Sequence, residues 1–394
     1  MLKNYALTEI LNSARLLERL TSRNNKHNNK LKLLIARSNT HQYVVSNIIS
    51  SSHNPLLLSN LTLTSLSKNA PCTRVTLQSV LKDLINANLV DKCPDPEDER
   101  KSYFLPKPDL INDWFSLVNL NSEINETIHF TFFSREQFLF HERALDFWKL
   151  DRNRAIEKNL MVSRYNLVIK PNDTESWLML SLCRRTLGRD FPPNRDYKRK
   201  MLGLSLRSAV KALEYSPNDP RTHANAATAY LHQRKSAKCL MHIKKAKSLG
   251  SLDRYTLSSL IYTSASNGNI DIAKYFIGLL ENKYRKLNHI FLASVGIILV
   301  ACHLKDKYLA LRSLEKIDVN IQYNSLVIAF VAGQYNAHEV LSKYYKITKN
   351  LEQKFFCRNQ VRSILKSSMT KENAEILLRG IDKSNWWSNS PQNL

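Results

Sequence analysis

Glycine and proline are too scarce in this chain for most folds that are built from strands and tight turns. The 394 residues include only 8 glycines and 12 prolines. Sandwiches, barrels and phosphate-binding loops need many turns, and a large share of these turns require glycine at positive φ. A chain of this length is also expected to divide into two or three folding units. The sequence therefore predicts a mainly α-helical protein with at least two parts.

The charge of the chain indicates a polyanionic partner. Lysine and arginine number 58 against 34 acidic residues, and the formal net charge is +24. Such an excess suits nucleic acid or an acidic membrane surface, and charge alone does not choose between them. The first ten residues lack the apolar core of a secretory signal, and the longest apolar run, Ile290 to Cys302, is too short to span a bilayer. We expect a cytoplasmic protein without membrane contact, in which residues 290–302 form a buried helix.

Patterns that indicate catalysis or metal binding do not occur in the sequence. The cysteines are scattered without a C-x-x-C pair or a histidine at ligand spacing, and His223, His232 and His242 do not belong to an H-E-x-x-H motif. No nucleophile elbow, phosphate-binding loop or paired-carboxylate signature is recognisable. We therefore predict a protein that is not an enzyme and that uses no cofactor and no metal.

The first sixty residues read as helices with one apolar side. Apolar residues recur at intervals of three and four over residues 5–23, which predicts an amphipathic helix, and residues 22–32 read as a solvated connection. A second helix is expected to begin near Thr40, which would cap it. Its inner side would carry Val44, Val45, Ile48 and Ile49.

Two helices separated by a turn are predicted next. Thr62 or Thr64 would cap a short helix through Lys68, the segment Asn69 to Cys72 would break it, and Thr73 would cap a second helix that ends near Ala87. An apolar stripe would face inward in this second helix: Leu77, Val80, Leu81 and Leu84. Polar and basic side chains would remain outside, suited to base edges and phosphates: Arg74, Thr76, Gln78, Ser79 and Lys82.

A small hairpin is expected directly after that helix. Leu89, Val90 and Cys93 precede a polar, acidic turn from Asp95 to Glu99, and a second strand follows over residues 101–105. The sequence therefore predicts two short strands beside the helix over residues 73–87.

These residues resemble the winged helix of the MarR (multiple antibiotic resistance regulator) type. The resemblance rests on Thr73-Arg74, the stripe through Leu84, Asn88-Leu89-Val90 and the string Asp95-Pro96-x-Asp98-x-Arg100. It implies a bacterial transcription regulator in which the helix from Thr73 enters the major groove, Arg100 reaches the minor groove and Asp98 holds the wing's shape. It also implies a homodimer formed through helices that flank the winged core, one of them over residues 5–23. The DNA-binding residues would be Thr73, Arg74, Thr76, Gln78, Ser79, Lys82, Asp98, Arg100 and Lys101.

A repeat is visible in the second half of the chain. Residues 211–217 and 245–249 carry related basic-alanine segments that are offset by 34 positions, which is the tetratricopeptide period. Trp177 and Leu180, and then Ala226, Ala227 and Tyr230, supply the large and small residues that paired helices need where they cross. The segment resembles tetratricopeptide repeats and predicts an α-solenoid, with weaker pairs near residues 267–280, 305–314 and 335–345.

One unit of the repeat is longer than the others and strongly basic. Pro171 and Pro217 are 46 positions apart, so that unit would hold an insertion, for which residues 188–200 are the candidate. Basic residues gather in and beside it: Arg184, Arg185, Arg189, Arg195, Lys198, Arg199, Lys200, Arg207 and Lys211. They would form either a solubilising face or a site for phosphate or an acidic protein, centred on Arg195, Lys198, Arg199 and Lys200.

These patterns predict three segments and one leading function. Residues 1–108 would form a winged helix-turn-helix DNA-binding domain, 109–135 a linker or adaptor segment, and 136–394 a helical-repeat domain of the tetratricopeptide type. The leading hypothesis is a transcriptional regulator that binds double-stranded DNA and uses its repeats to bind a peptide or protein, or to oligomerise. Two alternatives stay open. One is a repeat scaffold whose winged domain and basic surface bind acidic proteins, and the other is a winged-helix replication initiator.

Overall fold

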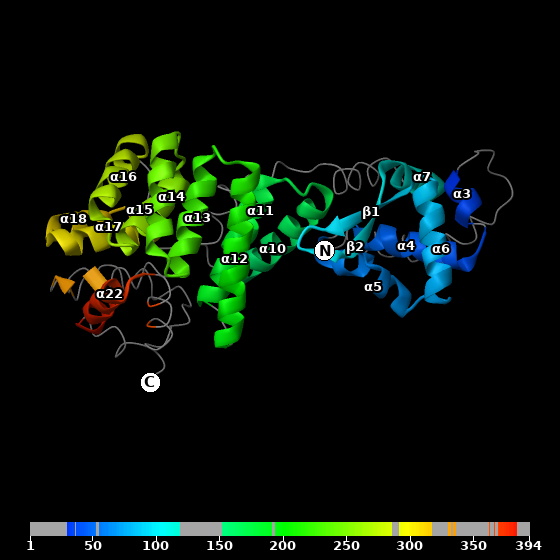
Figure 1. Cartoon of the computed structure of the whole chain (residues 1–394), viewed down its shortest axis with the longest axis horizontal. Coiled ribbons are helices and arrows are strands. Elements are labelled where there is room, and N and C mark those ends of the chain that lie inside the picture. Colours follow the sequence, from blue (N-terminus) through cyan, green and yellow to red (C-terminus); the bar gives the residue numbers. More distant parts are fainter. Residues whose placement is uncertain are drawn as a thin grey trace. The chain divides into compact units, whose positions relative to one another are not determined.

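The protein is mainly helical, with one small two-stranded antiparallel sheet (Figure 1). The computed structural model describes residues 30–35, 37–52, 55–118, 152–190, 194–285, 291–316, 330–331, 334–335, 362, 366 and 369–383. The expected helix over residues 5–23 and most of the expected pair near residues 335–345 lie outside this part. Within it, no helix combines the length and apolar character needed to cross a membrane.

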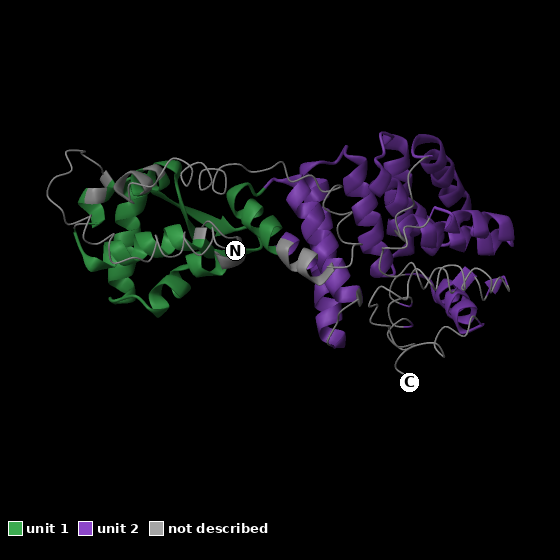
Figure 2. Ribbon diagram, turned by 180° about the vertical axis from the view of Figure 1, so that it is seen from behind, with its two compact units in different colours: residues 1–138, 161–171 green, residues 139–160, 172–394 purple. Residues whose placement is uncertain are grey.

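The chain divides into two compact units (Figure 2). The first comprises residues 1–138 and 161–171, and the second comprises residues 139–160 and 172–394. A short later segment, residues 161–171, thus belongs with the N-terminal unit. The expected segment limits at residues 108 and 135 stay predictions.

The first unit begins with α3 (Lys30–Ile35), α4 (Asn39–Ser52) and the 3-10 helix η1 (Pro55–Leu61). As predicted, α4 turns four β-branched residues fully inward: Val44, Val45, Ile48 and Ile49. The expected cap was wrong, because α4 begins before Thr40 and the hydroxyl of Ser38 accepts the backbone N–H of His41 at 3.3 Å. Thr40 is buried instead.

Two later helices complete the core of the first unit. Helix α7 (Pro108–Val118) buries Leu110, Ile111 and Trp114 in the same apolar cluster as α4. The C-terminal part of α10 (Arg152–Ile169) adds Val168 to that cluster. Three residues of the expected linker therefore contribute to a core, and its residues 119–135 lie outside the described part.

The second unit consists largely of helices that pack in consecutive pairs (Figure 1). The pairs are α11 (Thr174–Asp190) with α12 (Arg195–Tyr215), α13 (Pro220–His232) with α14 (Ser236–Leu249), α15 (Arg254–Ser266) with α16 (Ile270–Lys283), and α17 (Phe291–Leu304) with α18 (Lys307–Leu314). Helix α22 (Lys371–Lys383) lies near the end of the chain. The buried helix expected over residues 290–302 is confirmed as α17.

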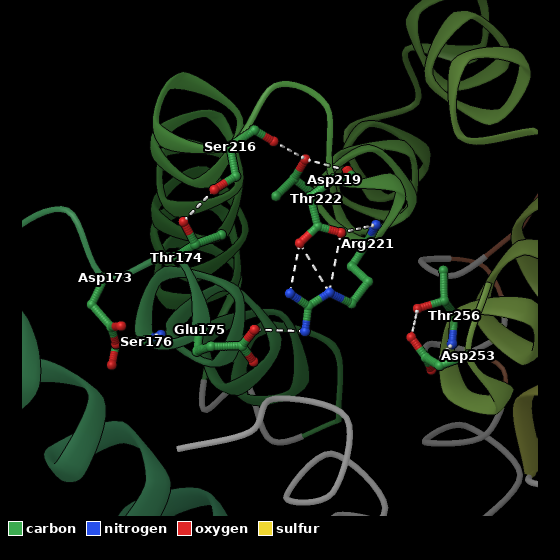
Figure 3. Close-up of polar contacts among 10 residues, drawn as sticks. All are labelled: Asp173, Thr174, Glu175, Ser176, Ser216, Asp219, Arg221, Thr222, Asp253 and Thr256. Atoms are coloured by element: carbon green, nitrogen blue, oxygen red, sulfur yellow. Dashed lines mark hydrogen bonds and ion pairs between the residues drawn. The ribbon is translucent and has the colours of Figure 1, made fainter. Parts of the chain in front are cut away.

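Aspartates begin the first helix of three successive pairs (Figure 3). Asp173 accepts the N–H of Ser176 at 3.1 Å, and Asp253 accepts the N–H of Thr256 at 2.9 Å. Asp219 accepts the N–H of Arg221 at 2.8 Å. A carboxylate in this position satisfies a backbone donor that the helix itself leaves without a partner. Asp219 and Asp253 are 34 positions apart, the interval between the two related segments in the sequence.

Most of the segment expected to be an insertion, residues 188–200, lies in two long helices, α11 and α12. Gly188 lies in α11, and Arg195 begins α12, which is 21 residues long. A Cβ atom at Gly188 would lie 3.0 Å from Cβ of Met201 and 3.2 Å from side-chain atoms of Leu202. The two helices therefore approach closely at a position where the sequence has glycine.

Three arginines of the expected basic cluster are buried. Arg184, Arg185 and Arg189 are 4 to 7% exposed. Arg184 Nη1 donates to Ser208 Oγ and Arg185 Nη1 donates to Asn225 Oδ1, both at 2.8 Å. Burial lowers the pKa of Arg185. Arg184 and Arg185 thus join α11 to α12 and α13. The expectation that the three arginines form a surface with the later basic residues was wrong, because all three are buried.

Candidate nucleic-acid interface

The two helices predicted before the hairpin form at the expected residues. Thr62 caps α5 (Leu63–Lys68) by accepting the N–H of Ser65. Thr73 caps α6 (Arg74–Asn86) by accepting the N–H of Thr76 at 3.3 Å. Local capping chemistry thus sets both starts, which is why the sequence was sufficient to locate them.

Helix α6 has the predicted inner and outer sides. Its buried residues are Leu77, Val80, Leu81 and Leu84, and the five expected outward residues are all exposed: Arg74, Thr76, Gln78, Ser79 and Lys82. Arg74, Gln78 and Lys82 recur every four residues and therefore share one side of the helix. On another side, Asp83 pairs with Arg37 at 3.7 Å.

Strand β1 (Val90–Asp95) pairs with β2 (Asp98–Pro106) in an antiparallel hairpin. The second strand begins three residues earlier than Lys101, where it was predicted to start. Asp95 and Asp98 are partners in the register, so only Pro96 and Glu97 form the turn. The Asp95 carboxylate accepts the N–H of Glu97 at 2.8 Å and so stabilises a tight turn within the expected acidic segment.

Asp98 holds two cations at the tip of this hairpin. Its Oδ1 accepts a hydrogen bond from Arg100 Nε at 3.0 Å, and its Oδ2 lies 3.6 Å from Lys101 Nζ. The hydrogen bond from Arg100 lowers the pKa of the Asp98 carboxyl. The Arg100 side chain remains 90% exposed, so Asp98 orients the guanidinium and leaves its outer face open to solvent.

A buried polar contact anchors the hairpin to a distant helix. Tyr103 Oη donates to Asp95 Oδ2 at 2.7 Å, and Arg164 of α10 donates to Tyr103 Oη at 3.4 Å. Burial and the Asp95 carboxylate raise the pKa of Tyr103 to about 12, so the phenol keeps the proton that it donates. Sequence reasoning missed this contact, because nothing near Arg164 in the chain relates it to residues 95–103.

The exposed polar side of α6 and the hairpin form the two sides of an open groove of about 390 Å³. Arg74, Gln78 and Lys82 line one side, and α5 contributes Leu63 and Thr64. Cations of the hairpin line the other side: Lys92, Arg100 and Lys101. The described lining residues include five basic side chains and no acidic one. The groove therefore attracts anions and offers a neutral hydrogen-bonding group, Gln78, between its cations.

The groove contains some of the nine expected contact residues and leaves others outside. Thr73, Thr76, Ser79 and Asp98 do not line it. The Thr73 and Thr76 hydroxyls lie 3.0 Å apart, so each already has a partner. Conversely, Lys92 lines the groove and was not among the expected residues.

The second expected site lies at the beginning of α12. Arg195, Arg199 and Lys200 are exposed, and Lys198 is half-buried. Asp196 lies among them and pairs with Arg199 at 3.8 Å. The charge of this cluster is therefore partly neutralised by its own helix.

The described residues do not bring together three or more side chains of the types that bind metal ions. The chain matches no protein-family model, and no curated protein matches it. The proposed function below therefore rests on the geometry of the two units.

Proposed function

We propose that the chain is a DNA-binding transcriptional regulator whose first unit is a winged helix-turn-helix. In this proposal α6 enters the major groove of duplex DNA and the β1–β2 hairpin is the wing. The helix pairs of the second unit form a tetratricopeptide-like solenoid that binds a protein or peptide or supports oligomerisation. The groove of five cations beside Gln78 is the observation that carries the proposal.

The chemistry of the groove suits a phosphate backbone with base edges between the strands. Arginine pairs with guanine and glutamine with adenine in the major groove, whereas lysines contact phosphates. Arg74 and Gln78 are one helical turn apart on the same side of α6. They are therefore assigned to base readout, and Lys82, Lys92 and Lys101 to phosphate contacts.

Selection of genomic DNA fragments tests this assignment. The full-length protein and the variant Arg74→Ala/Gln78→Ala would be titrated with selected fragments in the presence of random competitor DNA. We expect the variant to lose about 2 to 6 kcal/mol of discrimination, because it removes two side chains and each bidentate base contact contributes about 1 to 3 kcal/mol.

A matched control is available in the same unit. Arg37→Ala/Gln42→Ala removes the same two residue types outside the groove lining. This control should lose little discrimination, because neither residue lines the groove. It should also lose little stability, because the Arg37–Asp83 pair is exposed. If wild type binds every fragment equally, sequence readout is refuted and the scaffold function, with acidic proteins as partners, becomes the better account.

A further inference from the structure

Helix α14 has a basic surface. The sequence alone does not separate this helix from other lysine-rich segments of the chain. It contains four lysines and no acidic residue: Lys238, Lys244, Lys245 and Lys247. All four are exposed. Within the described part of the chain, none of them forms an ion pair.

Helix α12 of the same unit differs in this respect. Arg199 pairs with Asp196 at 3.8 Å, and Lys211 pairs with Glu214 at 2.7 Å. Acidic residues on α12 thus offset part of its charge, whereas the α14 lysines retain theirs. Lys247 is held in place by the ring of Tyr275 on α16, whose centroid lies 3.9 Å from Nζ.

The arrangement of α14 indicates which kind of polyanion it suits. Cys239, Ile243 and Ala246 are fully buried, so the apolar side of the helix is occupied and is not available to a lipid bilayer, and Met241 is a single exposed apolar side chain among the lysines. The lysines extend over about 14 Å of helix, a length in which duplex DNA carries about eight phosphates. We propose that the exposed side of α14 is a second nucleic-acid surface, which binds the phosphate backbone of duplex DNA without reading its sequence.

This inference rests on the proposed function in naming duplex DNA as the partner, but it assigns a different surface and a different role. Contacts of lysine with phosphate contribute affinity and salt dependence, whereas base contacts contribute discrimination. The two surfaces are therefore separable by experiment.

The test measures the salt dependence of binding to a short fluorescent duplex of random sequence, from about 50 to 200 mM NaCl. The variant is Lys238→Gln/Lys244→Gln/Lys245→Gln in the full chain. The slope of log affinity against log salt should fall in magnitude by roughly 2 to 3, because each phosphate contact contributes about 0.9, and affinity should fall about tenfold. Glutamine has a helix propensity close to that of lysine, and Lys→Arg at the same positions should restore the slope.

A matched control removes the same charge elsewhere. Lys170, Lys307 and Lys383 are exposed on other elements, and the corresponding triple glutamine variant should change the slope by less than about 0.5. Equal slopes for the two triple variants would overturn the inference, because net charge would then be sufficient to explain DNA binding. Binding of fluorescent polyglutamate would be measured in parallel as a model of an acidic protein. If the α14 variant loses polyglutamate binding while its duplex slope is unchanged, the inference is overturned in favour of an acidic protein partner.

The outcomes separate this inference from the proposed function. If the wild type discriminates among fragments and the α14 variant has an unchanged slope, only the proposed role of α14 is overturned. Wild type that binds all fragments equally, together with a reduced slope in that variant, refutes sequence readout and supports α14. Wild type that binds no duplex overturns both.

Discussion

At the scale of single residues, the hairpin depends on a hydroxyl that contacts a buried carboxylate. Tyr103→Phe removes the donor to Asp95, which is 4% exposed, and leaves Arg164 as a more distant partner at 3.6 Å. Because a hydrogen bond to a charged group contributes about 1.5 to 3 kcal/mol, we expect the free energy of unfolding of the first unit to fall by about 2 kcal/mol. Denaturant unfolding measures this change.

Tyr43→Phe is the matched control for that substitution. The Tyr43 hydroxyl donates to the neutral carbonyl of Leu66 at 3.2 Å, so its loss should cost about 1 kcal/mol or less. Equal destabilisation by the two variants would show that the hydrogen bond to Asp95 contributes no more stability than one to a neutral carbonyl. If the Tyr103 variant also binds DNA more weakly at temperatures where it is folded, the contact positions the hairpin as well as stabilising it.

A pair of histidines gives the second unit a dependence on pH. His223 Nδ1 lies 3.0 Å from His242 Nδ1, and His223 Nε2 lies 2.8 Å from the carbonyl of Pro217. Burial, His223 and Lys238 lower the pKa of His242 to about 4. The unfolded chain therefore binds more protons than the folded chain between about pH 4 and 6.5, and stability falls as pH decreases through that window.

We expect the protonation of His242 to lower the free energy of unfolding of the second unit by about 1 kcal/mol between pH 7 and pH 5, after allowance for solvent screening. His242→Gln should abolish this part of the pH dependence, because glutamine does not titrate. Thermal or denaturant unfolding of wild type and variant at both pH values measures it, since the other titrating groups are common to both proteins. Parallel pH profiles would contradict the expectation.

At the scale of elements, an ion pair joins the beginnings of α11 and α13, which belong to successive helix pairs (Figure 3). Arg221 of α13 lies 2.6 Å from Glu175 of α11, and both side chains are at least three-quarters buried (25% and 19% exposed). A double-mutant cycle with Glu175→Gln and Arg221→Met should give a coupling energy of about 1 kcal/mol or more in unfolding. The exposed pair Lys211–Glu214, at 2.7 Å within α12, should give about 0.5 kcal/mol or less. Equal couplings would show that burial adds nothing to the contact between α11 and α13.

At the scale of the whole molecule, the large positive charge is distributed unevenly among its surfaces. Some cations are buried within the second unit, as with Arg185, and others are paired on their own helix, as with Arg199. The α6–hairpin groove and the α14 surface retain basic side chains that are open to solvent. Net charge alone therefore indicates a polyanionic partner, whereas the structure shows which cations remain open to solvent and so where we propose that this partner binds.

The sequence by itself determined features that depend on neighbouring residues. Caps and the spacing of apolar residues located α5, α6 and the inner side of α4, because a helix start and an amphipathic side are encoded within a few turns of chain. Only the tertiary structure decided which cations share a groove, that Arg184 is buried, and that Arg164 anchors the hairpin across 61 positions of sequence. Those outcomes depend on packing between distant segments, which a local pattern does not specify.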